Sequence, residues 1–147
     1  MIKSQTVAFA LAAAVLGSAA PAAAEDWHPF SRSARIVYLA DVTSVVQAGD
    51  VTTVRIAKVP IAAPAPGNMS HTVDEFAFRC AAGQYRVTAT SSFAADASLE
   101  DRFEDEAEWE DVVNETFPAY LKEIACEGAM ADPPTWPTLR AFMDSRT

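Results

Sequence analysis

Two cysteines, Cys80 and Cys126, are the residues of this sequence best suited to a defined chemistry. Thiols can ligate a metal, act as nucleophiles or form a disulfide. The spacing is far from Cys-x-x-Cys and neither cysteine has a histidine nearby, so neither a metal site nor a redox motif is indicated. If the chain is exported to an oxidising compartment, its even number of cysteines predicts one disulfide, which would close a loop of 47 residues.

Acid–base or nucleophilic catalysis would need one of the two histidines, His28 or His71, beside a nucleophile and an acid. Ser70, His71 and Asp74 are close in sequence, but neighbouring positions of a strand point to opposite faces and rarely form a triad. Glycoside hydrolysis would need a carboxyl group buried enough to hold a proton, and a run of adjacent charges favours solvent instead. We therefore expect a protein without catalytic residues and without a cofactor.

The segment 100–111, with the sequence EDRFEDEAEWED, has eight carboxylates and one arginine. It is either a docking surface for a basic partner or a solvated loop that partly neutralises nearby arginines. The spacing of a calcium loop is absent, so we expect no bound metal. The candidate partner surface consists of Glu104, Asp105, Glu106, Glu108, Trp136 and Phe142.

Residues 1–24 have the pattern of a secretory signal peptide. Lys3 precedes an uncharged apolar stretch at residues 7–20, and three alanines end at Ala24, where we expect cleavage. The apolar stretch is shorter than the roughly 20 residues that span a bilayer, and no cysteine at the cleavage site would accept a lipid. We expect a periplasmic or secreted protein without stable membrane insertion.

The charge balance limits the possible partners. The chain has 11 Lys and Arg against 20 Asp and Glu, a formal net charge of −9, and cleavage would remove only Lys3. Such a surface repels nucleic acids and anionic lipids, because binding to phosphates depends on clustered basic residues. A basic protein partner is compatible with it, whereas the sequence does not define an oligomeric state.

The elements that must position these residues are mainly strands. β-Branched runs at 35–39 and 51–59 are separated by a turn at Gly49, and residues 63–68 form a loop rich in proline. Residues 76–90 alternate apolar and polar side chains around a turn and predict a β-hairpin. With residues 81–84 as the connection, the predicted pairs are Cys80 with Tyr85, Phe78 with Val87, Phe76 with Ala89 and, on the opposite face, Arg79 with Arg86.

A helix follows a weak last strand around Trp109, Val112 and Val113. Thr116 is the expected N-cap and Gly128 the stop signal. Phe117, Leu121, Ile124 and Ala125 would form its apolar face against the sheet. The predicted fold is α+β: an antiparallel sheet of about five or six strands, with one C-terminal helix packed on it and tied by the disulfide.

The C-terminal extension, residues 129–147, has several prolines followed by Trp136, Leu139, Phe142 and Met143. These apolar side chains either pack back on the preceding domain, residues 25–128, or dock onto a partner. Packing back is favoured because exposed apolar clusters are unfavourable in water.

The order of several motifs resembles that of the surface-adhesin protein E family over about residues 26–127. The motifs are Trp27 after the signal peptide, IVYLADVTSV, AGDVTTVRI, FRCAAGQYR, Trp109 and a helix that ends at Cys126. The resemblance implies a sheet with a bridged helix and no catalytic residues. The best-known member binds host extracellular-matrix and serum proteins from the bacterial surface. This sequence differs in lacking a lipid-attachment cysteine, in Phe78 and Arg79 before Cys80, and in its acidic segment and C-terminal extension.

Three functional hypotheses follow. The first is an exported, non-enzymatic binding domain of the adhesin E type that holds a protein in the cell envelope. The alternative is a periplasmic inhibitor of a basic enzyme such as lysozyme, because an acidic domain is steered toward a basic active site. The third is a structural envelope domain without a tight ligand.

Overall fold

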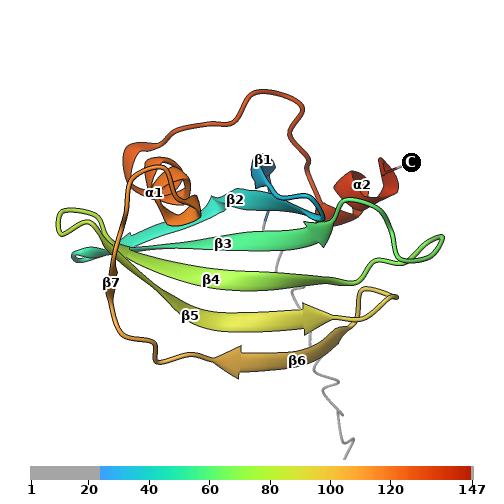
Figure 1. Cartoon of the computed structure of the whole chain (residues 1–147), viewed down its shortest axis with the longest axis horizontal. Coiled ribbons are helices and arrows are strands. Elements are labelled where there is room, and N and C mark those ends of the chain that lie inside the picture. Colours follow the sequence, from blue (N-terminus) through green and yellow to red (C-terminus); the bar gives the residue numbers. More distant parts are fainter. Residues whose placement is uncertain (1–23, 147) are drawn as a thin grey trace, which may run out of the picture.

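The chain folds around one antiparallel β-sheet in the computed structural model, which describes residues 24–146 (Figure 1). The proposed signal peptide lies outside the described residues except for Ala24. The strand order is β1-β2-β3-β4-β5-β6, and β7 pairs with β5. The strands are β1 Trp27–Arg32, β2 Ile36–Ala48, β3 Val51–Pro60, β4 His71–Arg79, β5 Gln84–Phe93, β6 Leu99–Glu104 and β7 Glu110–Asp111; the helices are α1 Phe117–Glu127 and α2 Leu139–Asp144.

The predicted fold class is confirmed, with one short helix more than expected. The weak last strand expected around Trp109, Val112 and Val113 is the two-residue β7, and β6 is a strand that the sequence analysis did not predict. Strands β1 to β6 follow one another in space as they do in sequence. Short turns connect them, except for the longer loop of residues 61–70 between β3 and β4. Gly49 and Gly83 adopt positive φ in two of these turns, at 65° and 64°, where a residue with a side chain would be strained. No helix among residues 24–146 is long and apolar enough to cross a membrane.

The register of the β4–β5 hairpin differs from the predicted one. Cys80 to Gly83 form the loop, and Gln84 already pairs with Arg79. The reason is that Gly83, with its positive φ, ends the loop one residue earlier than expected. Phe78 therefore lies opposite Tyr85 and Arg86 opposite Ala77, so the predicted Arg79–Arg86 pair is wrong. The shift is two residues, which leaves the apolar side chains on the predicted face.

Helix α1 covers the first face of the sheet. Its buried residues Leu121, Ile124 and Ala125 pack against Phe76 and Phe78. Thr116 occupies the predicted N-cap position, although its side chain makes no capping hydrogen bond, and Gly128 ends the helix in the left-handed conformation. The predicted disulfide is confirmed: Cys80 and Cys126 are bonded, with their Cα atoms 5.7 Å apart. It ties the end of α1 to the β4–β5 hairpin.

The C-terminal extension runs from α1 past β1 to α2 (Figure 1). Its contacts show that it covers part of the second face. Trp136 forms two backbone hydrogen bonds with Trp27 of β1, of 2.8 and 2.9 Å. Arg146 donates to the carbonyl oxygens of Pro60 and Asn68 at 2.8 and 3.1 Å. The apolar cluster of this face consists of Trp27, Leu39, Ala57, Val59, Met69 and Met143, with Trp136, Leu139 and Phe142 packed against it. The extension therefore packs back on its own domain.

Candidate functional site

The six residues of the predicted partner surface lie in two separate places. Glu104 ends β6, and Asp105, Glu106 and Glu108 are exposed in the segment that leads to β7. Trp136 and Phe142 are half-buried beside β1, with ring centroids 5.8 Å apart. Because β1 and β6 are opposite edges of the sheet, the structure does not bring the acidic and the aromatic residues together.

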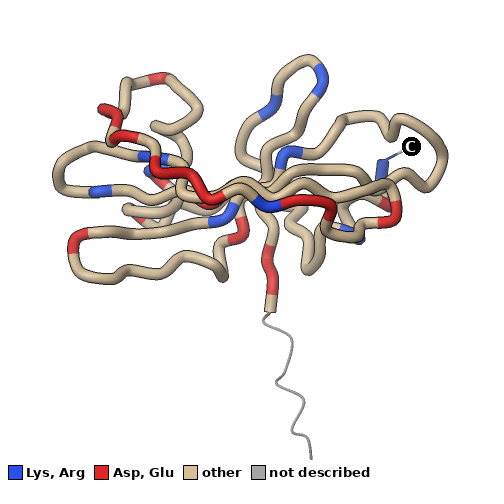
Figure 2. Tube along the Cα trace, turned by 90° about the horizontal axis from the view of Figure 1, so that it is seen from below, with Lys and Arg blue, Asp and Glu red and all other residues tan. Residues whose placement is uncertain are grey.

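Strand β6 and residues 105–111 form a surface that we call the acidic edge. In Figure 2, which looks at the β6 side of the sheet, several acidic residues follow one another along this edge. All six residues of β6 are exposed, including Leu99 and Phe103 at 57% and 59%. Strand β6 pairs with β5 on its inner side, and no other strand of the described residues pairs with its outer side; one of its backbone groups, the N–H of Arg102, donates to Asp101 Oδ1 at 2.8 Å.

Arg102 is the one basic residue of the acidic edge, and it is already paired. Its Nη1 lies 2.8 Å from Glu75 Oε1 of β4, and its Nε lies 2.9 Å from Glu104 Oε1. These two carboxylates, Glu75 first, raise the pKa of Arg102 further above its usual range. Arg102 therefore stays charged and neutralises only part of the negative charge on this edge.

Trp109 connects the acidic edge to the arginines of the β4–β5 hairpin. The guanidinium carbons of Arg79 and Arg86 lie over its ring, 4.1 and 4.6 Å from the centroid. Among the described residues neither arginine is ion-paired with a carboxylate, so the expected neutralisation by acidic side chains is not seen. The Trp109 ring stabilises the two guanidinium groups instead, through cation–π contacts.

Replacing Trp109 with alanine should lower the free energy of unfolding by about 1 to 2 kcal/mol, because two cation–π contacts are lost. Urea unfolding measures this. A Trp109→Phe variant keeps a ring and should lose about half as much. Equal stability of the wild type and the alanine variant would contradict the interpretation.

Ser70, His71 and Asp74 do not converge. The Ser70 hydroxyl donates to Asn68 Oδ1 at 2.6 Å, and Asp74 pairs with Lys58 at 2.7 Å. His71 faces the second side of the sheet, where its Nδ1 lies 2.7 Å from the Met69 carbonyl oxygen. No three His, Cys, Asp or Glu side chains within residues 24–146 are grouped so that they could hold a metal ion.

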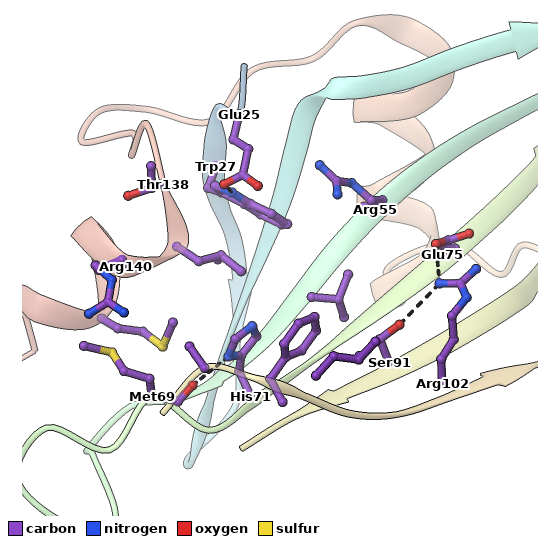
Figure 3. A pocket seen from close by; sticks show the side chains of 16 residues that line it. Glu25, Trp27, Arg55, Met69, His71, Glu75, Ser91, Arg102, Thr138 and Arg140 are labelled. Atoms are coloured by element: carbon purple, nitrogen blue, oxygen red, sulfur yellow. Dashed lines mark hydrogen bonds and ion pairs between the residues drawn. The ribbon is translucent and has the colours of Figure 1, made fainter. Parts of the chain in front are cut away.

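A cavity of about 450 Å³ opens on the second face of the sheet. Its walls come from β1, β3, β4, β5, β6 and α2, and Figure 3 shows the side chains that line it. Trp27, His71 and Met143 are buried in its wall, and Arg55, Arg102 and Arg140 bring positive charge to it. Sequence analysis did not predict this site, because its residues are scattered over most of the chain.

His71 is held rigidly in this wall. Its ring stacks on Phe93, with centroids 4.5 Å apart and planes at 2°. A carbonyl oxygen can only accept, so Nδ1 must donate its proton to Met69 and the neutral ring keeps a lone pair on Nε2. Burial lowers the pKa of His71 below its usual 6.5, although the hydrogen bond to Met69 opposes this, and Arg146 lowers it further. The imidazole is therefore uncharged at neutral pH.

The lowered pKa of His71 predicts a loss of stability in mild acid. Below about pH 6.5 the His71 side chain binds a proton more readily in the unfolded chain than in the folded protein. The contribution of neutral His71 to the free energy of unfolding is therefore complete above that pH, and it falls as the pH drops toward the pKa of the folded protein. Urea unfolding at about pH 7.5 and about pH 5 measures it. In a His71→Asn variant, the decrease should be smaller than in the wild type. An equal decrease in both proteins would contradict the assignment.

Comparison with protein-family models, with curated proteins and with solved structures found no match for this chain. The resemblance to the surface-adhesin protein E family therefore stays a prediction, and any function has to be argued from the geometry.

Proposed function

We propose that this protein is an exported, non-enzymatic binding domain that holds a basic protein partner along its acidic edge. The observation that supports the proposal most directly is the exposure of β6. A whole edge strand is open on its outer side and has exposed apolar side chains between its carboxylates.

An open edge strand can bind an extended segment of another protein. The segment adds to the sheet through backbone hydrogen bonds, while pockets and side chains beside the edge select its sequence. On β6, Phe103 lies on the helix side of the sheet opposite Thr90, whereas Arg102 lies on the cavity side opposite Ser91. A partner strand would therefore meet an apolar residue on the helix side and charge on both sides.

The charge of the edge selects for a basic partner. Residues 100–111 contain eight carboxylates and one arginine, Arg102, which is paired with Glu75 and Glu104. Such a field raises the rate of encounter with a cationic protein and disfavours acidic ones. Both effects weaken as salt screens the charges.

Export is part of the proposal. The disulfide fits an oxidising compartment such as the periplasm or the extracellular space, where bridges form and persist. The resemblance to surface-adhesin protein E points to a matrix or serum protein as the partner. The acidic edge also favours the alternative, inhibition of a basic enzyme such as lysozyme.

Binding to a basic lysozyme, measured by calorimetry and by inhibition of cell-wall lysis, tests the alternative. The mature domain should bind with an affinity that falls about tenfold or more between about 0.05 M and about 0.5 M salt. Neutralising the edge in a Glu104→Gln/Asp105→Asn/Glu106→Gln/Glu108→Gln variant should weaken binding by a similar factor.

The matched control removes four exposed carboxylates elsewhere, at Asp50, Glu115, Glu123 and Asp132. It has the same net charge as the edge variant, so an equal loss in both would show a general charge effect and contradict an edge site. Binding to purified matrix proteins tests the adhesin hypothesis in parallel. There, a Phe103→Ser variant should lose affinity at every salt concentration, because this contact is apolar. Absence of binding to both partner classes would overturn the proposal.

A further inference from the structure

We infer that the cavity on the second face of the sheet binds a small organic anion with an apolar body, such as a medium-chain carboxylate. This goes beyond the proposed function, because the cavity lies on the second face of the sheet, shares only Leu99 and Arg102 with the acidic edge, and would take a different type of ligand.

The size and the walls of the cavity fit such a ligand. Its volume of about 450 Å³ lies within the range of small-molecule sites, about 300 to 1,000 Å³. Half of the sixteen residues that line it are apolar, and the largest of these are Trp27, Met69, Phe93, Leu139 and Met143. An alkyl or aromatic body would replace water against these side chains.

The charge of the cavity contrasts with that of the chain. Three arginines line it against two carboxylates, Glu25 and Glu75, in a protein with a formal net charge of −9. Glu25 accepts a hydrogen bond from the Trp27 indole at 2.9 Å, and Glu75 is paired with Arg102. Arg102 therefore offsets the charge of Glu75, whereas Glu25 keeps its negative charge, because the indole N–H is a neutral donor.

The arginines are not equally engaged. Arg55 is paired with the buried Asp41, and Arg102 with Glu75 and Glu104. Arg140 of α2 has no ion pair among the described residues, and it lines the cavity from the α2 side (Figure 3). Arg140 is therefore the arginine of the lining that no carboxylate pairs among the described residues, and the anionic group of a ligand would bind there.

His71 adds a polar contact deep in the wall. With Nδ1 donating to Met69, the lone pair of Nε2 points toward the cavity (Figure 3). It can accept a hydrogen bond from a hydroxyl group or an amide N–H on the ligand body. Arg140 and His71 both border the apolar wall, which matches an amphipathic molecule with its anionic group toward α2.

Calorimetric titration of the mature protein with three probes tests this: octanoate, octan-1-ol and octylamine, which share one alkyl chain and differ in charge. Octanoate should bind at one saturable site at least about tenfold more tightly than the other two. An Arg140→Gln variant should bind octanoate no more tightly than octanol and leave octanol binding unchanged. Arg35→Gln, an exposed arginine that does not line the cavity, should change neither.

Filling the cavity gives an independent readout. A Val73→Phe variant places extra volume in the cavity and should weaken both octanoate and octanol, and Leu139→Phe on α2 repeats the test if the first variant unfolds more easily. Octanoate binding no tighter than octanol, or unchanged by both filling variants, would overturn the inference. An edge variant that keeps Glu104, the partner of Arg102, and carries only Asp105→Asn/Glu106→Gln/Glu108→Gln should bind octanoate normally, so failure of the proposed function leaves this test intact.

Discussion

Loss of the Cys80–Cys126 disulfide is expected to lower the free energy of unfolding by about 4 kcal/mol, the value of the chain-entropy model for a loop of this length. The bridge spans 46 positions of sequence, and without it the unfolded chain gains freedom that the folded protein does not. Typical domains have a stability of about 5 to 15 kcal/mol, so the loss would be a large share. Urea unfolding of the wild type and of a Cys80→Ala/Cys126→Ala variant measures it.

The control is the wild type unfolded with and without a reducing agent. Reduction should reproduce the alanine variant, because both remove the same constraint, whereas the alanine variant itself should not respond to reductant. Since α1 packs on the sheet through only a few buried residues, its amide protons should exchange faster with solvent in the reduced wild type and in the alanine variant than in the oxidised wild type. A loss below about 1 kcal/mol would show that packing alone holds α1 in place.

Replacing Asp41 with alanine is expected to lower the free energy of unfolding by about 3 kcal/mol. The side chain is completely buried. Its Oδ1 accepts hydrogen bonds from the backbone amides of Asp26 and Thr43, at 3.2 and 3.1 Å, and its Oδ2 is paired with Arg55. Alanine leaves these donors without their partner inside the protein, and unsatisfied buried donors are costly.

An Asp41→Asn variant separates the charge from the hydrogen bonds. Its amide oxygen can still accept from Asp26 and Thr43, but the charge opposite Arg55 is lost. We expect about half of the alanine effect, since Arg55 is partly exposed and water can solvate it. Urea unfolding of both variants measures this. Equal losses would show that the ion pair, and not the amide contacts, provides the stability.

The helix and the disulfide were predictable because their signals are local. Thr116 and Gly128 flank α1 as a cap and a stop signal, and the apolar residues between them repeat with helical spacing. The two cysteines are the only pair in the chain. Pairing them required only the assumption of an oxidising compartment.

The hairpin register was not predictable to the residue. The turn contains Ala81, Ala82 and Gly83, and composition alone did not say whether the loop ends at Gly83 or one position later. The choice moved the partner of Arg79 from Arg86 to Gln84. The contact of both arginines with Trp109 was also not predicted. It depends on where a segment more than 20 residues away in the sequence crosses the hairpin.

The cavity could not have been predicted from the sequence. Its arginines come from β3, β6 and α2, and each one in isolation looks like an ordinary solvated charge. Only the pairing of six strands and the return of the C-terminal extension bring them to one face. The sequence predicted that Trp136 either contacts a partner or packs on its own domain. In the structure its backbone hydrogen bonds with Trp27 hold the C-terminal extension, whose α2 forms one wall of the cavity, against β1.

The two borders of the sheet differ in a way that limits self-assembly. Strand β1 contains Pro29, which has no N–H to donate, and Trp136 is already bonded to its first residue. Strand β6 has no proline, and its outer side is not paired with another segment of the described residues. Growth of a fibre by strand pairing between copies needs an open edge strand on both sides of each molecule. With one edge obstructed, pairing of two copies through β6, which their like charges oppose, would end growth at a closed dimer instead of seeding an aggregate.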